Sequence, residues 1–208
     1  MPLEAKSVAL VVTAKVHNPS ILNPDFLLRN GIVSEEWGTA TDIVSIPSFS
    51  TLKYPARGIQ LTCQEERLQF EKQLSADRNF ADLTDCASRY VKVLPHVPYR
   101  ALGINCDFKS AKPNVASWTK EHFFSPKLLR ENADISNARM FFRFDIDDHS
   151  RLTIEFRTLV DEQALRVLTN CQYDGLDNLP KLTEALSRAQ HSMQISEGRA
   201  LRLMGESA

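Results

Sequence analysis

Between residues 139 and 159 the sequence alternates between apolar and polar residues on both sides of a short polar segment. A period of two is that of a β-strand, in which successive side chains point to opposite faces. The apolar residues are Met140, Phe142, Phe144 and Ile146 before the turn, and Leu152, Ile154 and Phe156 after it. With Asp148–Ser150 as a three-residue loop, Phe142 opposes Phe156 and both apolar sets face the same side. We therefore expect a hairpin with one buried face.

Similar patterns predict the other elements of the chain. Alternation indicates strands at 7–16, 99–108 and 164–173, and a hairpin formed by 59–63 and 68–70. Apolar residues at helical spacing predict helices at 80–94, 115–130 and 179–204, and Asn23 and Gly31 frame a shorter one. Pro47 interrupts the segment Thr41–Phe49, which therefore belongs at a sheet edge or ends there. Hairpins followed by helices indicate an α+β fold, with antiparallel sheets backed by helices.

The order of these elements repeats coarsely, because each half of the chain has a tight hairpin and a later helix. We expect one domain over 1–208, organised as two similar sub-domains, 1–110 and 111–208, with Ser110–Pro113 as the seam. The long C-terminal helix would span about 25 residues or 38 Å, more than one small sheet needs. We expect its end, from Ile195 onward, to pack on a partner subunit; the alternative is a frayed or kinked end near Gly198.

Composition restricts the class of protein. The chain has 208 residues, 43% apolar and 25% charged, which excludes disordered, fibrous and membrane-spanning proteins. A net charge of −1 gives no general attraction to nucleic acid or to an anionic membrane, so we expect neither as a partner. The four cysteines, at positions 63, 86, 106 and 171, are too far apart for a zinc or redox motif. Buried free thiols and the lack of a signal peptide predict a cytoplasmic protein. Because a zinc or redox motif is missing, we expect no cofactor.

Acidic residues gather at the tip of the expected hairpin, where Asp145, Asp147 and Asp148 precede His149. Carboxylates beside an imidazole can hold a hard cation such as Mg²⁺ or Ca²⁺. The spacing, however, lacks the glycine and the final glutamate of a calcium-binding loop. Asp, His and Ser also form turns readily, so we favour a turn.

Asp145 and Glu155 lie on neighbouring expected strands, as do the carboxylates of some metal-dependent nucleases. Arg157 would then steady the transition state, although an arginine cannot act as a titrating base. The expected register instead places Arg143 opposite Glu155 as an ordinary cross-strand pair. A metal-dependent phosphoester or nucleic-acid hydrolase, with Asp145, Asp147 and Glu155 as ligands, is therefore an alternative function.

Two groups of residues are candidates for binding. Trp118, Phe123 and Phe124 form an aromatic patch that belongs either to the core or to a small-molecule pocket, so small-molecule binding is a further alternative. Arg199 and Arg202 lie on the polar side of the last expected helix. We assign no catalytic residues, because turns, caps and charge ladders explain the polar residues. The sequence therefore predicts a non-enzymatic protein-binding or assembly protein, whose partner is another protein or a second copy, acting through a sheet face, a sheet edge or the last helix.

Three stretches follow one another in a recognisable order: Gly58–Leu61 with Leu68–Glu71, then Ala101–Asn105, then Phe144–Asp147. In this respect the chain resembles a sporadically distributed family of uncharacterised bacterial proteins of about this size. That family has a glutamine-bearing hairpin, a helix, a strand ending near an asparagine and a later Asp-rich hairpin. The chain lacks the Arg-Tyr pair usual before the asparagine, and residues up to Trp37 do not match. The resemblance covers about half the chain and implies neither a reaction nor site residues, because the family has no established activity.

Overall fold

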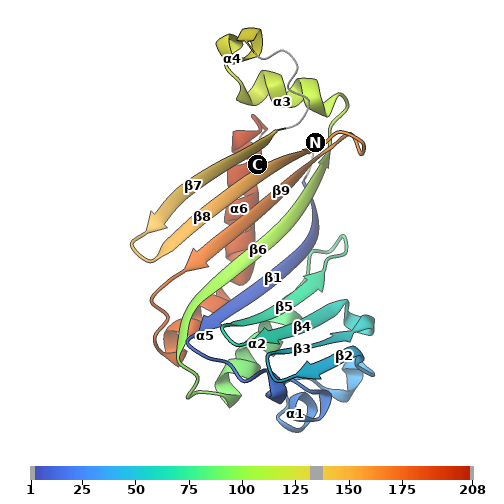
Figure 1. The fold of residues 1–208 in the computed structure, drawn as a ribbon, viewed down its shortest axis with the longest axis vertical. Helices are drawn as coiled ribbons and strands as arrows, with labels where there is room; N and C mark the ends of the chain where they lie inside the picture. The colour runs from blue at the N-terminus through green and yellow to red at the C-terminus, as the bar shows by residue number, and fades with distance from the viewer. Residues whose placement is uncertain (1–2, 132–137, 207–208) are drawn as a thin grey trace.

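The computed structural model of the protein describes residues 3–131 and 138–206. Within them the chain forms a nine-stranded antiparallel sheet in the order β2-β3-β4-β5-β1-β6-β9-β8-β7 (Figure 1). The strands are β1 Glu4–Ala14, β2 Thr41–Ile46, β3 Phe49–Tyr54, β4 Ile59–Gln64, β5 Arg67–Gln73, β6 Tyr99–Ala111, β7 Arg139–Asp147, β8 Ser150–Leu159 and β9 Ala164–Tyr173. One large antiparallel sheet with helices confirms the α+β class.

The helices cover one face of this sheet only in part, because some of them lie beyond the ends of its strands (Figure 1). They are α1 Pro24–Arg29, α2 Ala81–Val93, α3 Val115–Phe123, α4 Pro126–Glu131, α5 Leu179–Ser187 and α6 Ala189–Leu203, with short 3-10 helices at Pro19–Ile21, Glu35–Trp37 and Pro55–Arg57. In Figure 1, α2, α5 and α6 lie behind the strands, where they contact β5, β6, β8 and β9. No helix in the described part of the chain combines the length and the apolar composition needed to cross a membrane.

The core forms where alternate strand residues meet these helices. On β1, Val8, Leu10 and Val12 are fully buried, whereas Ala9 between them is only half-buried. Each buried aliphatic side chain of this kind contributes roughly 1.5–3 kcal/mol relative to an exposed one. The alternation gives the sheet one face under the helices and one open face.

Pro47 lies close to an edge, as expected, because β2 is the outermost strand. The strand ends at Ile46, and the chain then reverses into β3, which the sequence analysis missed. In the second half, β6 pairs with both β1 and β9. The proposed seam therefore begins inside the end of this central strand, which runs to Ala111.

Two expected helices are each divided in the structure. The helix expected over 115–130 is α3 and α4, because Pro126 cannot continue a helix and disfavours helical geometry at Ser125. The single helix expected over 179–204 is α5 and α6, which meet at Arg188. Just before the break, the Ser187 hydroxyl donates to the Glu184 carbonyl (2.7 Å), a local hydrogen bond of the kind that bends helices.

The β7–β8 hairpin buries the expected face but has a different register. Phe142 pairs with Ile154, and Phe156 pairs with Met140. The turn is formed by residues 148 and 149 alone, since Asp147 already pairs with Ser150. The predicted pairing was therefore wrong by two residues, a shift that leaves every side chain on its expected face.

Candidate functional site

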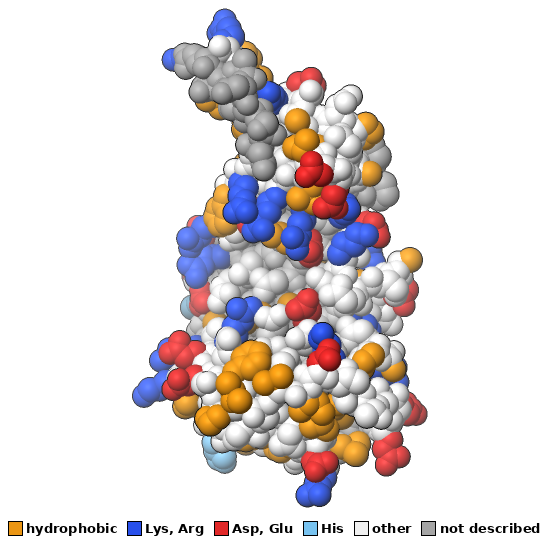
Figure 2. Space-filling model, turned by 45° about the vertical axis from the view of Figure 1, so that its right-hand side comes forward, with side chains coloured by type: hydrophobic (Ala, Val, Ile, Leu, Met, Phe, Trp, Pro, Cys, Tyr) orange, Lys and Arg blue, Asp and Glu red, His pale blue; other side chains and the backbone are white. Residues whose placement is uncertain are grey.

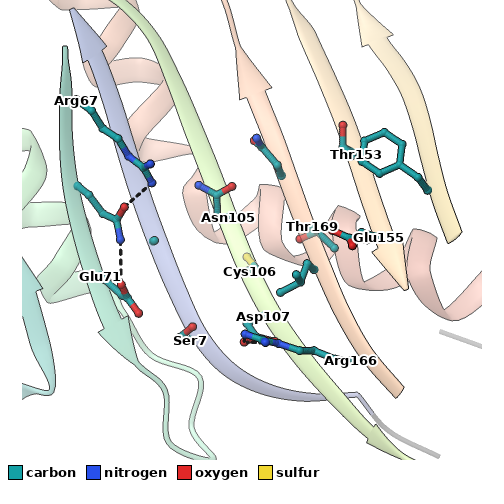
Figure 3. Close-up of a pocket in the computed structure, with 15 residues that line it drawn as sticks. Ser7, Arg67, Glu71, Asn105, Cys106, Asp107, Thr153, Glu155, Arg166 and Thr169 are labelled. Atoms are coloured by element: carbon teal, nitrogen blue, oxygen red, sulfur yellow. Dashed lines mark hydrogen bonds and ion pairs between the residues drawn. The ribbon is translucent and has the colours of Figure 1, made fainter. Parts of the chain in front are cut away.

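The open face of the sheet has a hollow at its centre with a volume of about 510 Å³. Its walls come from strands β1 and β5 to β9, so it crosses the middle of the sheet (Figure 3). The lining residues are Ser7, Ala9, Arg67, Gln69, Glu71, Asn105, Cys106, Asp107, Phe141, Thr153, Glu155, Arg166, Leu168, Thr169 and Asn170. Most of them are polar, which distinguishes this face from the apolar face under the helices.

Three neighbouring strands place Asn105, Asn170 and Thr153 side by side in the hollow, and we call these residues the polar row. Asn105 on β6 pairs with Asn170 on β9, which pairs with Thr153 on β8. All three side chains are half-buried, and the carbonyl oxygen of Asn170 is buried without a hydrogen-bond partner in the described part of the chain. Such an acceptor is rare in folded proteins, where nearly all buried polar atoms are paired.

Gly103 lies two residues before Asn105 on β6, and it leaves space for the side-chain amides of Asn170 and Gln172. A Cβ atom at this glycine would lie 3.4 Å from Asn170 Oδ1 and 3.3 Å from Gln172 Oε1. Both contacts are tighter than a Cβ usually makes, so a larger residue would displace these amides. A strand glycine of this kind marks a position that other groups approach closely.

A row of four cations crosses β6, β9, β8 and β7 at one end of the hollow, with one cation on each strand paired with the next. This basic row consists of Lys109, Arg166, Arg157 and Arg139. Figure 2 shows Lys and Arg side chains gathered in a band across this side of the molecule. Adjacent like charges destabilise a sheet unless they are neutralised, and three carboxylates, Asp107, Glu155 and Glu162, offset most of this charge.

The carboxylates bind the basic row tightly. Arg166 Nη2 lies 2.6 Å from Asp107 Oδ2, and Arg157 Nε lies 2.6 Å from Glu155 Oε1. The hydrogen bond from Arg157 is the main cause that holds the pKa of Glu155 below its ordinary value. These cations are therefore already engaged within the protein.

The opposite wall, on β5, carries charges without such partners. Arg67 Nη2 donates to Gln69 Oε1 (2.5 Å), and Gln69 Nε2 donates to Glu71 Oε2 (2.9 Å), as the dashed lines in Figure 3 show. In the described part of the chain neither Arg67 nor Glu71 forms an ion pair. The hollow thus offers one cation and one anion on the same strand.

Cys106 is not an activated nucleophile, and Glu155 is not poised to act as a general acid. Burial raises the pKa of the Cys106 thiol to about 12, so the thiolate is scarce at neutral pH. Glu155, with its lowered pKa, is ionised and held by Arg157. Within residues 3–131 and 138–206 no three His, Cys, Asp or Glu side chains are grouped to hold a metal ion. The arrangement is suited to binding through hydrogen bonds.

The structure does not bring together the metal ligands of the alternative hydrolase. Asp145 pairs with Arg151, whereas Glu155 pairs with Phe141, four positions away along β7. At the usual rise of a strand this separation is roughly 13 Å, too far for one ion. Asp147 lies in the turn, where its Oδ1 accepts a hydrogen bond from the His149 backbone N–H (2.8 Å).

The aromatic patch lies on the helix-covered side, away from the hollow. Phe123 contacts Trp118 and Phe156, with ring centroids 5.8 and 5.2 Å apart, and Phe124 packs against the same core. These contacts support the core interpretation of the patch.

The two arginines expected to bind also lie away from the hollow. Both belong to α6, and the Arg199 guanidinium lies 5.2 Å from the centre of the Phe144 ring. This cation–π contact stabilises α6 against β7. Arg202 lies in the last turn of α6.

The sequence analysis did not single out the polar row. One signal was present: the outward positions of β6 and β9 hold uncharged amides at Asn105, Asn170 and Gln172, where a solvated strand commonly carries charges. In comparisons with known proteins, no family model and no curated protein matches this chain.

Proposed function

We propose that the protein is a non-enzymatic protein-binding or assembly protein that acts through the open face of its sheet. One observation carries this proposal: the polar row lies in an uncovered hollow with an unpaired buried acceptor on Asn170. A buried polar atom without a partner costs about 1–3 kcal/mol. The Asn170 side chain as a whole is half-buried, so turning it toward the hollow would let a bound partner donate a hydrogen bond to this oxygen and offset the cost.

The edge strand β2 supports assembly with a further protein or a second copy. Ile43, Val44 and Ile46 are 51%, 45% and 49% exposed, and Asp42 is the only charged residue of the strand. Exposed apolar edge strands readily pair with other chains. The opposite edge, β7, is protected by charges such as Arg139.

The strand order also supports two similar halves. We infer that β1 followed by β2 to β5 and α2 corresponds to β6 followed by β7 to β9 and α5. In each set the first strand pairs with the last, and the two first strands pair with each other. The hollow would then lie across the junction between sub-domains. Four buried cysteines without disulfides support a reducing compartment, such as the cytoplasm, as the place of action.

A photo-crosslinking amino acid at Phe141 tests the proposal. This ring is 67% exposed and lines the hollow, so benzoylphenylalanine replaces it with little disturbance. The control position is Leu28 on α1, which is 45% exposed on the other side of the sheet.

In the cells that produce the protein, we expect irradiation to join the Phe141 position to another protein or to a second copy. The adduct should be lost when Asn170→Leu is added, and position 28 should not give it. An absent adduct, the same adduct from both positions, or an adduct indifferent to Asn170→Leu would contradict the proposal.

A further inference from the structure

We infer that the hollow binds an extended, unfolded stretch of polypeptide and recognises its backbone through Asn105 and Asn170. This inference rests on the proposed function and specifies the chemistry of the partner. It is carried by the polar row, by the charges around it and by the open shape of the hollow.

The polar row matches the chemistry of the peptide group. A side-chain amide has one carbonyl acceptor and an NH₂ donor, the same pair of functions that a peptide bond presents. Asn105 and Asn170 lie directly opposite each other on adjacent strands, and neither side chain forms a hydrogen bond within the described residues. Thr153, next to Asn170, adds a hydroxyl that can donate or accept. An extended chain has free N–H and C=O groups that can satisfy all three.

The charges of the hollow argue against a phosphate-bearing ligand. Arg166 is held by Asp107 through both Nε and Nη2, and Arg157 is held by Glu155 in the same way. A phosphate would have to displace these carboxylates before it could bind Arg166 or Arg157. With these two arginines paired, the site favours a ligand of little net charge, such as most peptide segments.

The opposite wall suits side chains of either sign. Arg67 and Glu71 lie at the two ends of a hydrogen-bonded series centred on Gln69. Neither forms an ion pair among the described residues, so each can attract an opposite charge on a bound chain. Ala9 and Leu168 add small apolar contacts between the strands. These features make the site tolerant of sequence, because the backbone supplies the common element.

The shape of the hollow favours a segment within a longer chain. It is an open depression lined by strands β1 and β5 to β9, and no residue of a described helix is among its lining. An extended polypeptide can therefore enter and leave it without a free end. A folded protein presents few unpaired backbone groups, since its own secondary structure satisfies them.

Fluorescence anisotropy with a labelled unfolded protein tests the inference. The probe is reduced and carboxamidomethylated α-lactalbumin, and native α-lactalbumin, maltoheptaose and a ten-nucleotide oligothymidylate are the competitors. We expect the unfolded probe to bind and none of the competitors to displace it. Asn105→Leu and Asn170→Leu should each weaken binding about five-fold, the effect of one net hydrogen bond. Gln60→Leu, which removes an amide from the same face outside the hollow, should leave the affinity unchanged.

Three results would overturn the inference: no binding of the unfolded probe, equal affinity in all variants, or displacement by the sugar or the oligonucleotide. The crosslinking experiment separates this failure from that of the proposed function. If the Phe141 position crosslinks to a folded partner while the unfolded probe does not bind, the proposed function stands and the inference falls. If neither occurs, both fall.

Discussion

Asn170→Leu should make the protein more stable while it weakens binding. Leucine has nearly the shape of asparagine and no polar atoms, so it removes the buried carbonyl oxygen that lacks a partner. Such an unsatisfied acceptor costs about 1–3 kcal/mol, and leucine also suits a strand better than asparagine. Since the side chain is only half-buried, we expect a gain of about 1–2 kcal/mol in the free energy of unfolding. For a chain of this length, the melting temperature should rise by roughly 3–6 °C.

Urea denaturation at constant m, together with thermal melting, measures this gain in the purified protein. Gln60→Leu is the matched control on the same face. Gln60 Nε2 donates to Thr51 Oγ1 (3.2 Å), so its loss removes a hydrogen bond and should not stabilise the fold. If Asn170→Leu unfolds at or below the urea midpoint of the parent, the acceptor is not a source of strain and the reasoning is wrong.

Three further predictions concern stability. Phe156→Ala should lower the unfolding free energy by about 3–5 kcal/mol in urea, because this ring is fully buried; a loss below 1 kcal/mol would contradict the packing. Lys112→Met removes the ammonium group that pairs with Glu206 and lies 4.7 Å from the centre of the Trp118 ring, and should cost about 1–2 kcal/mol in the same assay, whereas an unchanged midpoint would count against these contacts. Burial is the main cause that lowers the pKa of His17 below 6.5, so the folded state resists its protonation. The stability due to neutral His17 is complete above pH 6.5 and is lost as the pH falls below it. His17→Gln should therefore reduce the loss of stability between about pH 7.5 and 5.5, and a pH dependence equal to that of the parent would contradict this.

Periodicity predicted which face of each strand is buried more reliably than where strands begin, end and pair. The β7–β8 hairpin has its expected face, but apolar alternation is the same for registers two residues apart, and only the turn distinguishes them. Strand β3 was missed because Ser50 occupies a fully buried position, which interrupts the apolar pattern. The break at Arg188 depends on local hydrogen bonding that an apolar stripe does not reveal.

The polar row could not be found from the sequence for a topological reason. Asn105, Thr153 and Asn170 are distant in the chain, and they become neighbours only because β9 lies between β6 and β8. The sequence shows the outward position of each residue but not the order of strands. The candidate residues that the sequence did suggest, such as Asp145 and Glu155, belong to one hairpin, where proximity along the chain can be inferred directly.

The central position of β1 also determines the order in which the protein can fold. Val8 has Lys72 on one side and Cys106 on the other, so β1 is made before both of its neighbours and waits longest for the second. Strand β6 in turn needs β9, since Leu102 pairs with Tyr173. Such distant pairings slow folding to milliseconds or seconds, as in other β-rich domains. During synthesis the apolar side of a half-built sheet is therefore exposed, and a nascent chain of this protein should itself need protection from aggregation.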